Sequence, residues 1–189
     1  MDESTVETFI ETYTGRRVDP FDVSPGDVHL PDVAAGLSHT CRFGGHCDHF
    51  YSVAHHSLNV SHELPRADPR LQLIGLLHDA AEAYLGDIPR PLKARLERVQ
   101  PAEERILDSV WESLAIEPPT ETEWERVMAA DDRLLAFEAN ELLEDASWAP
   151  SSPDLGYDLG PESPATTREQ YRTRATSLLA DVRGSRPEH

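Results

Sequence analysis

Residues 75–87, Gly75-Leu-Leu-His-Asp-Ala-Ala-Glu-Ala-Tyr-Leu-Gly-Asp87, place an adjacent histidine and aspartate inside an otherwise apolar run. Buried ionisable groups cost several kcal/mol unless they are paired or hold a metal. His78 and Glu82 are four residues apart, so both side chains project from one side of a helix, and Asp79 borders the same side. The stretch therefore predicts a metal-binding helix.

The rest of the chain shows helical spacing of apolar residues and no dependable strand pattern, which predicts an all-α helical bundle of about six to eight helices. Ser52, Asp68 and Thr120 are the expected N-caps, with a capping box at Thr120–Glu123. We expect one domain over 1–189, with its core at about 12–145, a loop at 146–166 and a tail at 184–189. The expected helices lie at about 1–14, 30–37, 52–64, 69–85, 92–99, 101–115, 120–144 and 167–183.

The charge balance is strongly acidic, because 35 acidic against 17 basic residues give the 189-residue chain a formal net charge of −18. Such a surface repels nucleic acid and anionic membranes, so we expect neither as a partner. Lys93 is the single lysine. This balance suits a protein kept soluble in concentrated salt, where the screening length is only ~3 Å at 1 M, and it predicts a halophilic source. The alternative is an ordinary acidic protein from a GC-rich genome.

The acidic N-terminus is unlike a signal peptide, and no apolar run approaches the length of a membrane span. We therefore expect a cytoplasmic protein. A homodimer is the commonest assembly, and the sequence leaves the oligomeric state open.

Further metal ligands must come from other helices. His56 is the preferred upstream candidate because it shares an apolar face with Val53 and Val60, whereas His55 lies about a third of a turn away. Asp131 is the preferred downstream candidate because it interrupts an apolar helix segment, with Asp132 as the alternative. Imidazole and carboxylate ligands suit one divalent cation, and Mn, Co, Zn, Mg, Fe and Ni are not distinguished.

In its order and spacing of His56, His78-Asp79 and Asp131, the sequence resembles the HD-domain metal-dependent phosphohydrolases, and most closely a subgroup like the bacterial 5′-deoxynucleotidases. The resemblance covers about residues 12–145. It is carried by four motifs: Tyr13-Thr-Gly15, Cys41-Arg-Phe-Gly-Gly-His46, Tyr51-Ser-Val-Ala-His-His-Ser57 and the extended block from His78 to Lys93. The last block is the most specific, because a His-Asp pair alone occurs by chance.

The resemblance implies a helical fold with one divalent ion held by four side chains: His56, His78, Asp79 and Asp131. Glu82 would activate the attacking water or relay a proton, and Arg42 would bind the substrate phosphate. Asp87 would contact the sugar or orient the leaving side, although its place after Gly86 also suits a cap of the next turn. Lys93 is a further phosphate contact in the same scheme. Arginine suits the phosphate role on physical grounds also, because it offers two parallel hydrogen bonds. We therefore expect hydrolysis of a phosphate monoester, a nucleoside 5′-monophosphate.

Three rival functions share parts of this pattern. A nucleotide phosphodiesterase or triphosphohydrolase would use the same ligands, and His55 and His62 leave a second ion open. A nucleotide-binding module without turnover would keep the ligands but lose the proton-handling acid, which this chain retains as Glu82. A structural helical domain would hold no metal. A zinc loop at Cys41, His46, Cys47 and His49 is disfavoured, because the spacing does not match the usual zinc motifs.

Overall fold

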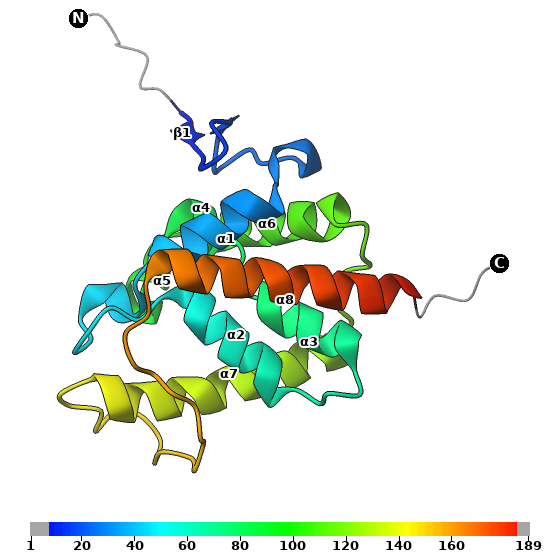
Figure 1. Ribbon diagram of the computed structural model, residues 1–189. Helices are drawn as coiled ribbons and strands as arrows, with labels where there is room; N and C mark the ends of the chain where they lie inside the picture. The colour runs from blue at the N-terminus through cyan, green and yellow to red at the C-terminus, as the bar shows by residue number, and fades with distance from the viewer. Residues whose placement is uncertain (1–7, 185–189) are drawn as a thin grey trace, which may run out of the picture.

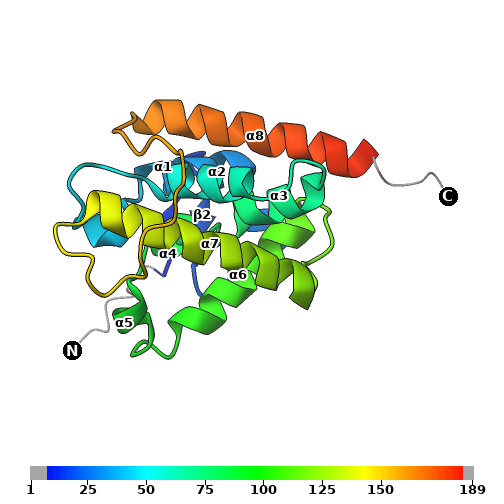
Figure 2. The same ribbon diagram turned by 90° about the horizontal axis from the view of Figure 1, so that it is seen from below.

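Helices α2 (Val53–Glu63) and α3 (Pro69–Leu77) form the centre of the protein, which is described here by a computed structural model over residues 8–184. Both helices begin at the expected caps, since the Ser52 hydroxyl accepts a hydrogen bond from His55 N and the Asp68 carboxylate accepts one from Leu71 N. Helix α8 (Pro164–Gly184) covers one side of this pair and α7 (Glu121–Leu142) covers the other (Figures 1 and 2).

Helix α1 (Leu30–His39) packs against α8, and α4 (Glu82–Leu85) packs against α1. The packing between α1 and α4 is close, because a Cβ at Gly36 would stand 2.6 Å from the Ala83 carbonyl oxygen. The all-α class is confirmed. Within residues 8–184, none of the helices is both long and apolar enough to cross a membrane. The remaining helical elements are η1 (Pro25–Asp27), η2 (Arg42–Gly45), α5 (Arg90–Lys93) and α6 (Val99–Ser113).

The N-terminal helix expected over 1–14 is wrong for its described part, and residues 1–7 lie outside the described residues. Strands β1 (Ile10–Glu11) and β2 (Arg17–Val18) instead form an antiparallel hairpin. The turn between them contains Gly15 at φ +80°, a conformation that favours glycine. Thr14 anchors the turn to α1, because its amide and its hydroxyl both donate to the buried Asp32 carboxylate. The apolar side chains that suggested a helix, such as Ile10 and Tyr13, are exposed rather than buried on one face.

The continuous central helix expected over 69–85 is also wrong, because α3 ends at Leu77 and α4 starts at Glu82. In the intervening turns the amide of Ala80 donates to the Leu77 carbonyl rather than to that of Leu76. The Leu76 carbonyl accepts a hydrogen bond from the Tyr171 hydroxyl of α8 at 2.8 Å instead. The backbone stays right-handed, but its hydrogen bonds shorten to the tighter three-residue pattern, which often marks a functional segment.

The later helices follow the expected order with shifted bounds. The helix expected over 92–99 shrinks to the four residues of α5, since Pro89 and Pro91 remove two backbone donors and Leu92 stays exposed. Helix α7 opens on the expected capping box at Thr120. Helix α8 starts three residues before the expected 167 and includes Gly184 at its end; its expected inward residues, among them Tyr171 and Leu178, are buried.

Candidate metal centre

Three helical segments bring four sequence-predicted ligands together near the middle of the protein. Helix α2 supplies His56, the turn that follows α3 supplies His78 and Asp79, and α7 supplies Asp131. One ligand atom from each of His56, His78 and Asp79 lies within 4.8 Å of the other two. Asp131 closes the group, because its Oδ1 lies 3.0 Å from His56 Nε2 and 3.8 Å from His78 Nε2.

Hydrogen bonds on the far side of each imidazole fix which nitrogen faces the cluster. The Nδ1 of His78 donates to the Gly75 carbonyl at 2.7 Å, and the Nδ1 of His56 donates to the Glu138 carboxylate at 2.8 Å. Because a carbonyl and a carboxylate can only accept, the proton sits on Nδ1 in both rings. When either ring is neutral, its Nε2 therefore presents a lone pair to the cluster, as metal-ligating histidines require.

The residues present fit a divalent cation. Ligands bound at about 2.0–2.2 Å stand about 3 to 3.5 Å from one another around one ion. The Nε2 atoms lie 3.3 Å (His78) and 3.7 Å (His56) from Asp79 Oδ2, close to that spacing. Both Nε2 atoms are buried and have no hydrogen-bond partner among the described residues, although Asp131 Oδ1 is near each of them. A cation between these atoms would satisfy all of them together.

The electrostatics of the cluster favour positive charge. Burial and Arg42 lower the pKa of His56, but the carboxylates of Glu138 and Asp131 outweigh them and raise it to about 10. Burial also opposes protonation of His78, and the carboxylates of Asp79 and Asp131 again raise its pKa. The carboxylates that attract a proton to these rings would attract a metal ion in its place, so metal binding releases protons.

The structure places the two alternative ligand residues, Asp132 and His55, away from the cluster. Asp132 is exposed and its carboxylate lies 3.1 Å from Arg90 Nη2, whereas Asp131 is buried against the histidines. His55 points away from the cluster, stacks near Tyr51 with ring centroids 4.8 Å apart, and lines a separate groove. These positions agree with the preference for His56 and Asp131.

Glu138 is a residue of this site that the sequence analysis missed. It is fully buried on α7 and accepts hydrogen bonds from His56 Nδ1, from the Tyr51 hydroxyl at 2.8 Å and from Arg42 Nη2 at 3.0 Å. A signal was present in the sequence, because Glu138 follows Asp131 by seven residues, about two turns on one helix face.

Arg42 lies beside the cluster on the short η2 element, where Phe43 and Gly44 take the left-handed conformation at φ 56° and 61°. Its guanidinium is buried between the Glu138 carboxylate and Asp79, with Nη1 3.8 Å from Asp79 Oδ2. Burial alone would lower the pKa of Arg42, but Glu138, Asp79 and Asp131 raise it, so the side chain stays charged.

Glu82 is buried at the start of α4, and its Oε2 has no hydrogen-bond partner within residues 8–184. Burial, followed by the negative charges of Asp79 and Asp87, raises the pKa of Glu82 well above its ordinary value. A raised pKa makes this carboxylate a stronger base than an ordinary glutamate, which suits a group that transfers protons. Asp87 is half-buried next to it, after Gly86 at φ +78° ends α4.

Helix α5 brings two cations to the same side of the protein. Lys93 lies 2.6 Å from Glu103 of α6, and its pKa is raised because this pairing and the charges of Glu82 and Asp79 outweigh its burial. Arg90, which the sequence analysis did not single out, has its Nη2 atom 3.7 Å from Asp131 Oδ2. Both cations thus lie within electrostatic reach of the cluster.

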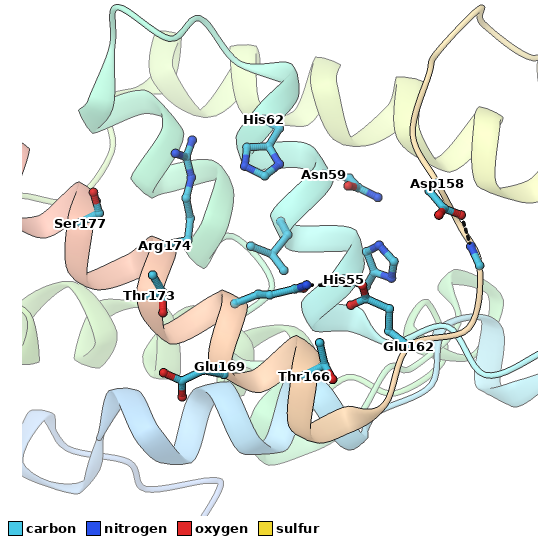
Figure 3. A pocket seen from close by; sticks show the side chains of 13 residues that line it. His55, Asn59, His62, Asp158, Glu162, Thr166, Glu169, Thr173, Arg174 and Ser177 are labelled. Carbon is cyan, nitrogen blue, oxygen red and sulfur yellow. Dashed lines mark hydrogen bonds between the residues drawn. The ribbon is translucent and has the colours of Figure 1, made fainter.

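A groove of about 840 Å³ lies between α2 and α8 and is separate from the metal centre (Figure 3). His55, Asn59 and His62 line its α2 side, and Arg174 lies on the α8 side (Figure 3).

The cysteine loop shows no sign, within residues 8–184, of the zinc site that the sequence analysis disfavoured. Its free thiols at Cys41 and Cys47 lie 3.6 Å apart, and His49 donates to the Leu159 carbonyl rather than joining them.

Comparison with known proteins identifies a family whose model covers these residues. The family model described as HD domain matches residues 39–146, which include all four clustered ligands. The chain is 38% identical over 144 residues to the uncharacterized protein YfdR of Escherichia coli (strain K12), covering 76% of this chain and 78% of that protein. It is 44% identical over 89 residues to an uncharacterized protein of Rhodobacter capsulatus, covering 44% of this chain and 45% of that protein.

Proposed function

The chain belongs to the HD domain family of metal-dependent phosphohydrolases, and from this premise we propose that it releases phosphate from a nucleoside 5′-monophosphate using one divalent ion. The proposal rests above all on the two buried Nε2 atoms that face Asp79 and Asp131 without a hydrogen-bond partner among the described residues. Buried nitrogens in this state are costly unless a cation binds them.

The proposed roles follow from the positions of the side chains. The bound ion would supply Lewis acidity, which makes water more acidic and withdraws charge from a phosphoryl oxygen. His56, His78, Asp79 and Asp131 would hold that ion. Glu82 would take the proton of the attacking water at its unpaired Oε2 and return it to the leaving oxygen, which its raised pKa supports.

Substrate binding would use charges beside the cluster. Arg42 would face the phosphate, because its guanidinium borders Asp79 and keeps its charge when buried. Asp87 would contact the sugar from its half-buried position after Gly86, and Lys93 would add a second positive charge toward the phosphate. These cations are needed locally, because a net charge of −18 repels an anionic substrate at long range.

The test is a panel of nucleotides assayed for phosphate release with added manganese, cobalt, magnesium or zinc. We expect inorganic phosphate from nucleoside 5′-monophosphates and none without metal. Asp79→Ala should lose activity, whereas Asp108→Ala, which removes an exposed acid of α6, serves as the matched control and should retain it.

The products separate this proposal from its rivals. Release of pyrophosphate or triphosphate from nucleoside triphosphates would replace it with a triphosphohydrolase. Tight nucleotide binding without turnover would indicate a binding module, and a purified protein that binds no divalent metal would contradict the proposal altogether.

We extend the proposal to a cytoplasmic enzyme of a halophilic organism. The support is the combination of 35 acidic residues with a single lysine, Lys93. Salt screens the repulsion among acidic side chains, so the free energy of unfolding should increase as potassium chloride is raised from low to molar concentration. A decrease in the free energy of unfolding over that range would contradict adaptation to salt.

A further inference from the structure

The metal centre is most open on the side of Asp79. The Asp79 side chain is 20% exposed, compared with 10% for Asp131 and 2% or less for the two histidines. A substrate that reaches the cluster must therefore approach past Asp79 and the outer oxygen of Asp131.

Arg90 borders the outer side of Asp131, the second most exposed member of the cluster. Its Nη2 is 3.7 Å from Asp131 Oδ2, the oxygen opposite the one that faces the histidines, and 3.1 Å from Asp132 Oδ1. The Arg90 side chain is 67% exposed, so one side of its guanidinium borders a proposed metal ligand and the other side borders solvent. A phosphate bound to an ion at the cluster would lie within reach of this group.

Arg90 is also the cation that can leave its present partner most easily. Arg42 is buried against Glu138 at 3.0 Å, and Lys93 is held by Glu103 at 2.6 Å. The partner of Arg90 is Asp132, which is itself 63% exposed, and exposed ion pairs contribute only ~0–1 kcal/mol. An arginine fork that exchanges one such carboxylate for a phosphate gains two parallel, charge-assisted hydrogen bonds.

We propose that Arg90 binds the phosphate of the substrate at the opening of the metal centre, and that Asp132 holds Arg90 there until the phosphate displaces it. The identity of the phosphate as that of a substrate rests on the proposed function. The placement of an anion site between Arg90 and the cluster rests on the position of Arg90 and on a cation held by the cluster. Asp132 then acts as a competitor of the phosphate for Arg90.

The competitor role gives opposite predictions for the two members of the pair. We would load the full chain with manganese and titrate it with inorganic phosphate by calorimetry, with manganese affinity measured in parallel. Arg90→Gln should weaken phosphate binding about 10-fold or more, while Asp132→Asn should strengthen it about 2- to 5-fold. Arg133→Gln, which removes an exposed arginine of α7 that pairs with Glu63 at 3.0 Å, should leave phosphate binding unchanged.

An Arg90→Gln protein that binds manganese and phosphate like the wild type would overturn the proposal. So would equal weakening by Arg90→Gln and Asp132→Asn, because that result describes an ion pair that only supports the structure. Absence of phosphate binding by the manganese-loaded wild type would overturn it as well. Phosphate binding with the predicted pattern, but without turnover of any monophosphate, would refute the proposed function and leave the anion site standing.

Discussion

Replacing Glu138 by glutamine tests how the buried network supports the metal centre. One carboxylate oxygen of Glu138 accepts from His56 and Tyr51, and the other accepts from Arg42. Glutamine can keep the first set of contacts through its carbonyl oxygen, but its amide then faces the Arg42 guanidinium. Two donors would oppose each other in a site with no exposure to solvent.

Glu138→Gln should lower both the stability of the protein and its metal affinity, and the two effects can be measured separately. Breaking a buried ion pair by neutralising one partner costs about 3–5 kcal/mol, so the free energy of unfolding of the metal-free protein should fall by that amount. A neutral acceptor also holds the His56 Nδ1–H less strongly and makes Nε2 a weaker ligand. Loss of such outer contacts typically lowers metal affinity about 10- to 100-fold. Tyr51→Phe removes a donor to the same oxygen without changing its charge, so metal affinity should change only ~2-fold.

The assay is manganese or zinc titration by calorimetry, with urea denaturation of the metal-free protein alongside. If Glu138→Gln is too unstable, the double variant with Arg42→Gln removes the unpaired buried charge and should recover stability while metal affinity stays low. A folded Glu138→Gln protein whose metal dissociation constant lies within about 2-fold of the wild type would refute the assigned role of Glu138.

Three further predictions concern other parts of the protein. Asp79→Ala should reduce bound metal and phosphate release together, and elemental analysis showing full metal content with retained turnover would contradict the proposed site. Arg70 lowers the pKa of Glu123 from 4.5 to about 2, so wild type should be more stable than Glu123→Gln by about 1 kcal/mol above pH 4.5. That advantage should shrink as the pH falls toward 2, and a difference between the urea unfolding free energies that stays constant over this range would exclude the ion pair as its cause. Gly36→Ala should cost about 1–3 kcal/mol of unfolding free energy because the new methyl overlaps the Ala83 backbone, and an unchanged melting temperature would show that α1 and α4 adjust freely.

Helical periodicity and caps predicted most of the fold, because these signals are local. Ser52, Asp68 and Thr120 mark helix starts through hydrogen bonds to amides three residues ahead, so neighbouring residues suffice to identify them. The errors arise where distant residues decide. The turn between strands β1 and β2 is tied to α1 by the bond from Thr14 to Asp32, 18 residues away. The break after Leu77 involves the Tyr171 hydroxyl, which no local pattern around residue 77 contains.

The candidate site shows the same division. Helical facing was enough to prefer His56 over His55 and Asp131 over Asp132, because each choice depends only on position around one helix. Glu138 was missed because a single acid on a long helix is usually solvated, and only the donors that meet it from other elements distinguish it. Arg90 was missed for a related reason, since an exposed arginine gains meaning only from Asp131, which is distant in sequence.

The break in the central helix and the metal centre are best understood as one feature. The helix tightens after Leu77, and there the His78 ring turns back to donate to the Gly75 carbonyl, which directs its Nε2 toward the cluster. The neighbouring Leu76 carbonyl would then be buried without its helical donor, and Tyr171 supplies one from α8. Helix α8 lies outside the segment matched by the HD domain family, yet it satisfies the backbone on which His78 and Asp79 are held. The geometry of the proposed ligands His78 and Asp79 therefore involves a helix that contributes none of the proposed ligands.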